Sequence, residues 1–471
     1  MKKFWKPEYL VSLAGCGLII YLLFVGPFIG VADNGDFLRM MNTIGLNYYD
    51  IAASYTDQFF NFSHSRFAYE NLFRGFYPSS QILIVLVPRL IGGLIHGSFF
   101  DVRLLGAVYG LLLLVATLLL VKYNARGSYV TGLLLGVAIL FVFYDIGYLA
   151  YFNSLFGEPV SMVFMLLTFA LGLRLTSQEK PTTKGLTLFF IAILFLVTSK
   201  IQNAPIGIAF ALIFLRFMTL DGERKWRKLA LRFSIAIFLV SIVMYVTAPK
   251  ELKHINLYQT VFFGILNESP DVKGDLQDLG LPERLEVLAG TNYFQTDTVI
   301  KQDDPSLVPD FYDRVSHKDV LFFYLEHPGR LIDNMEYAAS NSMAIRPYYL
   351  GNYEKSENKP AGALSYTYSG WSEFKNKHIP HTLGFLTIFY LVYFAGAVFQ
   401  YFRSRDVQGR VAGELLMLLG LIGIFSFLVP ILGDGRADIG KHLFLFNVCF
   451  DMMVVVMFGW VVHKVVGIVR R

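Results

Sequence analysis

Charged residues are scarce in this chain: they make up 16% of its 471 residues, whereas a soluble domain averages about 25%. Cysteine is rarer still. Both cysteines, Cys16 and Cys449, lie inside apolar runs, which argues against a disulfide framework or a zinc site. The sequence has no Walker P-loop, no glycine-rich dinucleotide loop and no histidine-rich metal motif. A reaction catalysed here must therefore draw its energy from a molecule already in the membrane, and we expect no nucleic-acid partner.

Long apolar runs, in contrast, are abundant, since 55% of the residues are hydrophobic. A bilayer-spanning helix needs about 20 such residues. We therefore expect an all-α polytopic membrane protein with about ten transmembrane helices, at 9–30, 103–122, 128–146, 158–175, 185–200, 203–219, 231–249, 382–402, 411–432 and 440–463.

Two apolar segments need a separate interpretation. The run 79–97 contains Pro88 and Arg89 near its middle, and an arginine at the centre of a span costs about 2.5–3.5 kcal/mol. We expect this run to form a helix at the membrane interface. The run Leu10–Gly30 is longer than the apolar core of a cleavable signal peptide, so we expect it to be retained.

The positions of the basic residues predict the orientation. Cytoplasmic loops are enriched in lysine and arginine, and Lys2, Lys3 and Lys6 place the N-terminus in the cytoplasm. Ten spans then place the C-terminus there too, together with the basic segments 122–126, 174–184, 221–232, 403–410 and 470–471.

The segment 250–380 then faces outward, and it carries 13 Lys/Arg against 19 Asp/Glu. The predicted organisation has three parts. Residues 1–249 form a transmembrane module whose first outer loop, 31–102, carries acids and interfacial helices. Residues 250–380 form a small, mainly helical extracytoplasmic segment, and 381–471 form the last transmembrane helices.

Polar residues gather in four predicted outer hairpins: "DNGD", "YFNSLFGEP", "TSKIQNAP" and "GDGRADIGKH". Charges so close to apolar runs are costly unless they are paired or functional. We therefore expect side chains from these four hairpins to converge in one outward-facing site.

The first hairpin leaves several interpretations open. Asp33 or Asn34 is suited to cap a helix that begins near Phe37. Asp33 and Asp36 would share one face of a helix and repel, which raises a pKa as a general base requires. With the Asn34 amide they also suit Mg²⁺ or Mn²⁺ as a cofactor. Asn34 and Arg39 are candidates for substrate binding.

The next two hairpins carry one acid and three polar candidates. Glu158 opens a predicted span and is either a favourable first-turn acid or a second catalytic carboxylate in the same cavity. Lys200, Gln202 and Asn203 stand in a very short hairpin, where they either snorkel and cap or contact phosphate and sugar hydroxyls.

The last hairpin offers cations for a phosphate. Arg436 suits bidentate binding and Lys441 suits a point charge, with His442 beside it; the alternative is a set of loop ion pairs. Asp451 lies near the middle of the last span, where a buried acid is either functional or a hydrogen-bonded structural group.

These motifs carry a resemblance. "ADNGDFLRMM", "FGEP", "SKIQNAP", "ESPDVKGDLQDLGL", "WSEFKNKHIP" and "GDGRADIGKHLFLFN" resemble the GT-C glycosyltransferases, and more closely the bacterial glycan-biosynthesis hexosyltransferases of the WsfD type. The likeness runs over nearly the whole chain. A separate C-terminal catalytic or carbohydrate-binding domain, which some GT-C members carry, is not found in the sequence, so 250–380 would have to supply acceptor specificity.

The resemblance implies an inverting transfer on the outer face of the bacterial cell membrane. The partners would be a polyprenyl-phosphate-linked sugar donor, a cell-envelope glycan acceptor and membrane lipid. Asp33 or Asp36 would act as the base, Glu158 would act near the sugar, and outer cations would bind the departing phosphate. A polysaccharide polymerase or ligase would rely more on outer arginines, and a transporter would show internal repeats and several intramembrane charges.

Overall fold

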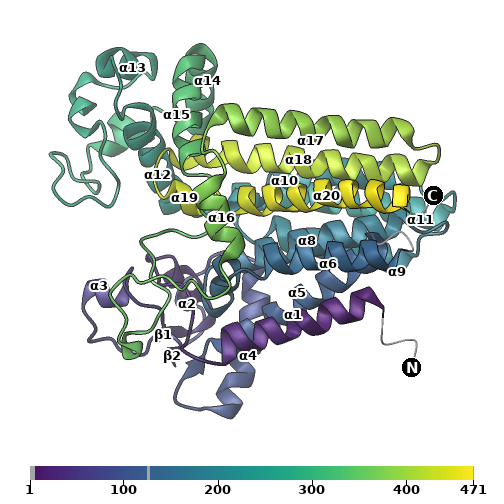
Figure 1. Cartoon of the computed structure of the whole chain (residues 1–471). Helices are drawn as coiled ribbons and strands as arrows, with labels where there is room; N and C mark the ends of the chain where they lie inside the picture. Colours follow the sequence, from purple (N-terminus) through teal and green to yellow (C-terminus); the bar gives the residue numbers. More distant parts are fainter. Residues whose placement is uncertain (1–5, 125–127, 470–471) are drawn as a thin grey trace.

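The computed structural model describes residues 6–124 and 128–469. Within them, ten helices lie side by side in a bundle (Figure 1) and coincide with the ten predicted apolar runs. They are α1 (Pro7–Phe24), α5 (Arg103–Asn124), α6 (Tyr129–Phe143), α8 (Glu158–Thr176), α9 (Thr183–Val197), α10 (Ile206–Phe217), α11 (Arg224–Val246), α17 (Leu383–Arg403), α18 (Val407–Asp434) and α20 (Phe444–Val469).

Seven of these helices are long and apolar enough to cross a membrane. An eighth span results if α6 is joined, across a bend of 54°, to α7 (Ile146–Leu149) and the 3-10 turn η1 (Ala150–Asn153). Helices α9 and α10 are shorter, with 15 and 12 residues. Twelve residues extend about 18 Å, less than the roughly 30 Å hydrocarbon core. The chain is a mostly helical polytopic membrane protein, and its described residues include seven or eight segments long enough to span a bilayer, together with this short pair.

Helix α8 occupies the centre of the bundle. In its most apolar window 89% of the residues are buried, and it packs against α5, α9, α18 and α20. The hydrophobic effect does not drive helices together in lipid, so such contacts are stabilised by close packing through small residues. A Cβ on Gly110 of α5 would lie 2.9 Å from Ile19 of α1, so glycine allows this close approach. Because α8 begins at Glu158, the central helix carries that acid to one end of the bundle.

The first long loop, residues 25–102, folds into a compact unit at that end. It contains α2 (Phe37–Ile44), α3 (Tyr55–Gln58) and α4 (Gln81–Ile95). It also contains an antiparallel sheet of three short strands, which the sequence did not predict. The strands are β1 (Leu46–Tyr48), β2 (Arg66–Tyr69) and β3 (Phe100–Asp101), with Leu46 opposite Tyr69 and Arg66 opposite Asp101.

Helix α4 covers the run 79–97. It packs against α2 and α5 and exposes large apolar side chains, among them Leu83, Val87 and Leu94. Arg89 turns inward, where Nη2 donates to the Glu70 carbonyl at 3.2 Å and the guanidinium lies 5.3 Å from the Tyr69 ring. This two-sided helix has the character of an interfacial helix, and its position in a membrane stays a prediction.

Residues 250–380 are mainly helical and divide into two portions. The first has its own hydrophobic core, formed by buried side chains between Leu257 and Tyr324. The second, 341–369, runs as an irregular segment across the first loop (Figure 1), and Ala32 N–H donates to the Gly351 carbonyl at 2.9 Å. The elements are α12 (Lys250–Tyr258), η3 (Gln259–Ile265), α13 (Val272–Asp278), η4 (Glu283–Leu288), η5 (Val308–Tyr312), α14 (His317–Glu326), α15 (Pro328–Ser340), η6 (Lys355–Glu357) and α16 (Gly370–His378).

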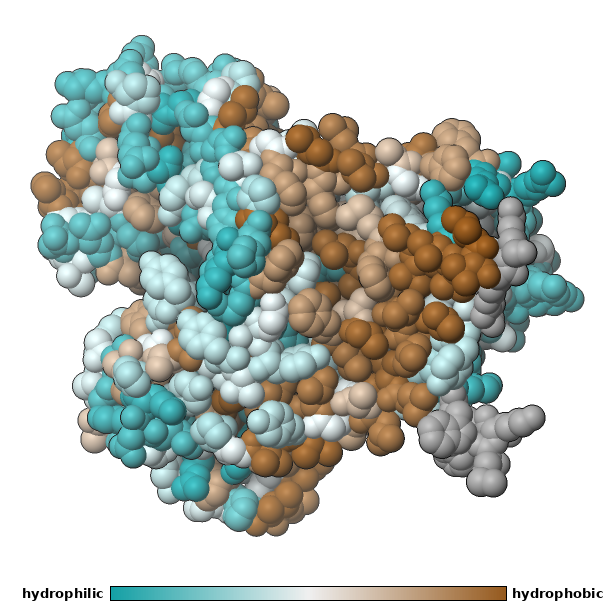
Figure 2. Space-filling view, in the orientation of Figure 1, coloured by the Kyte–Doolittle hydropathy of each residue, from teal (hydrophilic) through white to brown (hydrophobic). Residues whose placement is uncertain are grey.

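The bundle has two different ends. The polar end carries the first loop and residues 250–380, whereas the terminal end is where α1 begins and α20 ends (Figure 1). Hydrophobic side chains gather over the bundle between hydrophilic ends (Figure 2), as expected for a protein that spans a membrane. Some basic residues used to predict orientation lie outside the described residues: Lys2, Lys3, Arg126, Arg470 and Arg471.

Candidate functional site

The stretch "DNGD" forms a tight turn at the start of α2, and Asp33 holds this turn together. Its Oδ1 accepts hydrogen bonds from the backbone N–H groups of Gly35 (2.8 Å) and Phe37 (3.1 Å), and its Oδ2 accepts one from the Tyr48 hydroxyl. Gly35 has φ = 101°, a conformation that glycine adopts without strain. Asp33 is fully buried. Of the roles left open for it, capping α2 is the one that this geometry supports.

Burial raises the pKa of Asp33 to about 6, although the hydrogen bonds from Tyr48 and Phe37 favour the ionised form. Its ordinary value is 3.8. The folded protein therefore holds the proton more tightly than the unfolded chain, and this stabilisation is lost as the pH rises from about 4 through 6. Two pKa units correspond to about 3 kcal/mol.

We therefore expect Asp33→Asn to stabilise the protein relative to wild type at pH 7 and to make much less difference at pH 4. Asparagine keeps the bonds to the turn but carries no charge that burial penalises. Thermal unfolding of both proteins across this pH range measures the difference. Asp50→Asn, at an exposed position of the same loop, is the control and should show no such trend. A stability difference that stays constant from pH 4 to 7 would contradict the raised pKa.

Asp36, three residues on, has a different environment. Its side chain is 21% exposed, and its carboxylate pairs with Lys441 Nζ and, at 3.1 Å, with Arg39 Nη2. Burial alone would raise the pKa of Asp36, but the charges of Lys441, Arg39 and Lys200 outweigh it and hold that pKa below its usual range. In turn, burial would lower the pKa of Lys441, and the carboxylates of Asp36, Asp438 and Glu158 raise it. Both groups are therefore charged.

A second ion pair joins two other hairpins. Lys200 Nζ lies 2.6 Å from Glu158 Oε1. Glu158 is 1% exposed, and its other oxygen, Oε2, is buried without a hydrogen-bond partner. A buried carboxylate oxygen that lacks a donor costs free energy. It is therefore a position where a hydroxyl of a bound molecule would be stabilising.

These groups line one small cavity at the polar end. The predicted convergence is thus observed for Asp36, Arg39, Glu158 and Lys200, and Lys441 reaches the same carboxylate from the fourth hairpin. Three protein segments supply the lining: the first loop, the α7–α8 connection and the α9–α10 hairpin. Its residues are Asp36, Arg39, Met40, Tyr77, Gln81, Leu155, Phe156, Gly157, Glu158, Ser199 and Lys200.

Asn34 supports the fourth hairpin and does not line the cavity. Its Nδ2 donates to Asp438 Oδ2 at 2.7 Å, and the Tyr349 hydroxyl donates to the other oxygen of the same carboxylate. Asp438 also lies 3.7 Å from Lys441 Nζ. Asn34 and Tyr349 therefore hold the loop that presents Lys441.

Four other predicted binding residues do not line the cavity, because each forms a hydrogen bond or an ion pair with another part of the protein. Gln202 donates to the His442 carbonyl at 3.0 Å, and the His442 ring lies 2.8 Å from Asp434. Asn203 is buried and donates to two serine hydroxyls. Arg436 pairs with Glu268 at 2.6 Å and donates to Asn334 at 3.0 Å, so it joins its loop to residues 250–340 and stays out of the cavity.

Among the lining residues that sequence reasoning missed are Tyr77 and Gln81. Gln81 Nε2 donates to the carbonyls of Leu155 and Phe156, both at 2.7 Å, and so fixes the chain just before Glu158. The available signal was that "YPSSQ" places polar residues at the start of a run otherwise interpreted as interfacial.

Asp451, left open between function and structure, belongs to a buried network outside this cavity. Its Oδ1 lies 2.6 Å from Lys375 Nζ, and its Oδ2 accepts from the Tyr148 hydroxyl (2.6 Å) and from Trp371 Nε1 (2.8 Å). Lys375 also donates to Asn447 at 2.6 Å. Every charged atom has a partner, so the network ties α16 to α20 and favours the structural role.

Asp33 and Asp36, the residues that the sequence suggested for Mg²⁺ or Mn²⁺, have other partners in this structure. Hydrogen-bond donors engage both oxygens of Asp33, and two cationic side chains engage Asp36. Across residues 6–124 and 128–469, no group of three or more His, Cys, Asp or Glu could hold a metal ion. A dependence on divalent cations therefore stays a prediction, which dialysis against a chelator would test.

Comparison with known proteins gives one family match. A family model described as "YfdI N-terminal transmembrane domain" matches residues 1–471, the whole chain. A search of curated proteins gave no match. Among solved structures, the chain is similar to the Archaeoglobus fulgidus oligosaccharyltransferase in its apo form, with 12% identity and a TM-score of 0.40. The alignment covers 99% of this chain and 52% of that one, so this chain spans about half its length. The closer WsfD-type resemblance stays a prediction.

Proposed function

The chain belongs to the family of YfdI N-terminal transmembrane domains, and from this premise we propose that it is a membrane glycosyltransferase. It would move a hexose from a polyprenyl-phosphate donor to a cell-envelope glycan, with inversion, at the cavity on its polar end. The observation that carries the proposal is the set of charges at that cavity. Arg39 and Lys200 line it, Lys441 pairs with its Asp36, each of the three cations is held by a carboxylate, and Glu158 Oε2 lacks a donor.

The three cations suit the leaving group. The donor is a phosphodiester with one negative charge, and the departing polyprenyl phosphate gains a second as the bond from phosphate oxygen to sugar carbon breaks. Positive groups placed where charge develops lower the barrier. Arg39 can bind two phosphate oxygens, whereas Lys200 and Lys441 act as point charges.

Asp36 is the better placed of the two aspartates to act as base, because it lines the cavity whereas Asp33 is fully buried. A general base must first lie within hydrogen-bonding distance of the proton that it accepts, and its pKa is considered second. In the free protein Asp36 is weakly basic, since Lys441 and Arg39 pair with it. A bound phosphate would compete for both cations. Asp36 would then lose its partners, become more basic and accept the proton of the incoming hydroxyl.

Glu158 would bind the sugar. Its Oε1 stays with Lys200 while Oε2, buried and without a partner, accepts a hydrogen bond from a sugar hydroxyl. Hydrogen bonds to a charged acceptor contribute about 1.5–3 kcal/mol. The acceptor glycan would be recognised by residues 250–380, which lie at the same end.

The charge distribution supports an outward-facing cavity. Basic clusters such as 224–232 and 403–410 lie at the terminal end, and cytoplasmic loops are enriched in such residues. The terminal end would therefore face the cytoplasm of a bacterial cell, and the cavity would face the outside. A lipid-linked donor at that cavity would require no nucleotide.

The phosphate site can be tested without knowing the acceptor. Purified protein should bind polyprenyl monophosphate more tightly than polyprenol of the same chain length, measured by native mass spectrometry. Arg39→Gln should reduce this preference roughly tenfold or more, because it removes a charge-assisted contact. Arg39 is 39% exposed in its side chain, so the variant should fold.

Arg436→Gln is the matched control, since Arg436 lies at the same end but outside the cavity. It should leave the preference for phosphate unchanged. Equal binding of the phosphate and the alcohol by the wild-type protein would refute a phosphate site here.

A further inference from the structure

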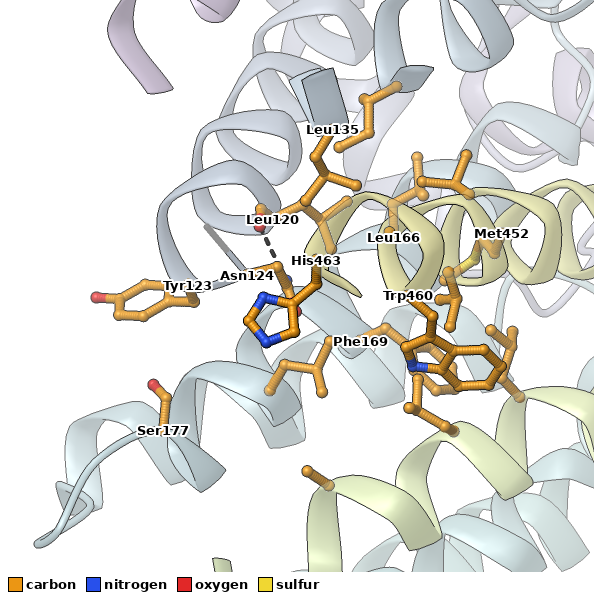
Figure 3. Close-up of a pocket in the computed structure, with 18 of the residues that line it drawn as sticks. Leu120, Tyr123, Asn124, Leu135, Leu166, Phe169, Ser177, Met452, Trp460 and His463 are labelled. Atoms are coloured by element: carbon orange, nitrogen blue, oxygen red, sulfur yellow. Dashed lines mark hydrogen bonds between the residues drawn. The ribbon is translucent and has the colours of Figure 1, made fainter. Parts of the chain in front are cut away.

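A second cavity, of about 280 Å³, lies in the other half of the bundle, among α5, α6, α8, α18 and α20 (Figure 3). On α20, the lining extends from Met452 to His463, which is near the end of that helix. Eleven residues of helix extend about 16 Å, roughly half of the 30 Å hydrocarbon core. The cavity therefore runs from the terminal end through about one leaflet, the depth of one acyl chain.

The walls of this cavity suit a hydrocarbon chain. Leu135, Leu166 and Phe169 face it (Figure 3), and its polar side chains are a minority. Two of these are already satisfied within the protein, because Trp460 Nε1 donates to Gln400 at 2.9 Å and Asn124 donates to the Leu120 carbonyl at 2.8 Å.

One hydrogen-bond donor in the lining of this cavity, and another next to a lining side chain, lack acceptors. Thr131 lines it and is 3% exposed, yet its Oγ1 has no partner. Arg174 Nε is also buried without a partner, and its guanidinium lies 5.6 Å from the ring of Tyr123, which lines the cavity. Lys122 Nζ lies 5.4 Å from the same ring. Unpartnered donors and two cations together favour an anionic acceptor.

We propose that this cavity binds an anionic phospholipid, with one acyl chain between the helices and the phosphate at Arg174 and Thr131. The lipid enters from the leaflet at the terminal end, so it is distinct from the donor at the polar end. The inference does not depend on the proposed transferase activity.

Trp460 provides a direct readout because it lines the cavity. Protein in phosphatidylcholine nanodiscs receives a small mole fraction of either phosphatidylglycerol or phosphatidylcholine with brominated acyl chains, which quench tryptophan on contact. The fluorescence of a Trp460→Phe variant is subtracted. Brominated phosphatidylglycerol should quench Trp460 at about one fifth of the mole fraction that brominated phosphatidylcholine needs, since each basic residue near an anionic headgroup favours it by about fivefold.

Two pairs of variants locate the lipid. Val455→Phe, which fills the cavity, should abolish the selective quenching, whereas Val465→Phe, on the exposed face of the same helix, should retain it. Arg174→Gln should reduce phosphatidylglycerol to the potency of phosphatidylcholine. Arg405→Gln, at an exposed position between α17 and α18 that does not line the cavity, should not. Equal quenching by both lipids overturns the proposal, as does selectivity that survives Arg174→Gln. If Val455→Phe fails to fold, the Arg174 pair alone decides.

Discussion

Replacing Asp36 by Asn should lower the turnover of sugar transfer by about 10²–10⁴-fold, the contribution of a positioned general base. The same change should leave the binding of polyprenyl phosphate as tight as in wild type, or tighter. The reason lies in the ion pairs, because Asp36 occupies Lys441 and Arg39 in the free protein. An asparagine releases both cations for the phosphate but cannot accept the proton.

Two measurements separate this role from a structural one. Single-turnover transfer from a labelled polyprenyl-phosphate hexose reports the chemical step, and equilibrium binding of polyprenyl phosphate reports the phosphate site. Asp33→Asn is the matched control, three residues away in the same turn, and should keep transfer within a few fold of wild type. If Asp33→Asn abolishes transfer and Asp36→Asn does not, the two assignments must be exchanged.

The sequence was sufficient to predict that the polar hairpins meet. Apolar runs fix the helices, hairpins that leave the same side of a membrane lie close together, and charges beside apolar runs need partners. Glu158 and Lys200 follow this logic, since each stands within a few residues of a helix end and they pair at 2.6 Å.

What the sequence could not predict were pairings that depend on side-chain direction. Asp33 and Asp36 occur in one four-residue motif, and only the turn decides that one caps α2 while the other faces the cavity. Arg436 stands five residues before Lys441 but turns to Glu268, 168 residues away in the chain. The strands β1 to β3 have two to four residues each, too few for an alternating pattern to be visible.

The partner of Asp451 could not be predicted for the same reason, because this pairing also depends on side-chain direction. Lys375 stands 76 residues earlier, in a helix that looks polar by composition, yet both side chains are fully buried and lie 2.6 Å apart. Removing one member of a buried ion pair leaves an uncompensated charge, which typically costs 3–5 kcal/mol. Removing both charges avoids that cost.

Lys375→Met should therefore lower the thermal stability of the purified protein severely, by about 3–5 kcal/mol. The double variant Lys375→Met/Asp451→Asn should recover most of the loss, because asparagine can still accept from Tyr148 and Trp371. Lys377, two residues along the same helix, pairs with Glu373 at 2.6 Å but is 64% exposed, so Lys377→Met should cost at most about 1 kcal/mol. Equal losses in Lys375→Met and the double variant would mean that packing of the lysine chain, and not its charge, joins α16 to α20.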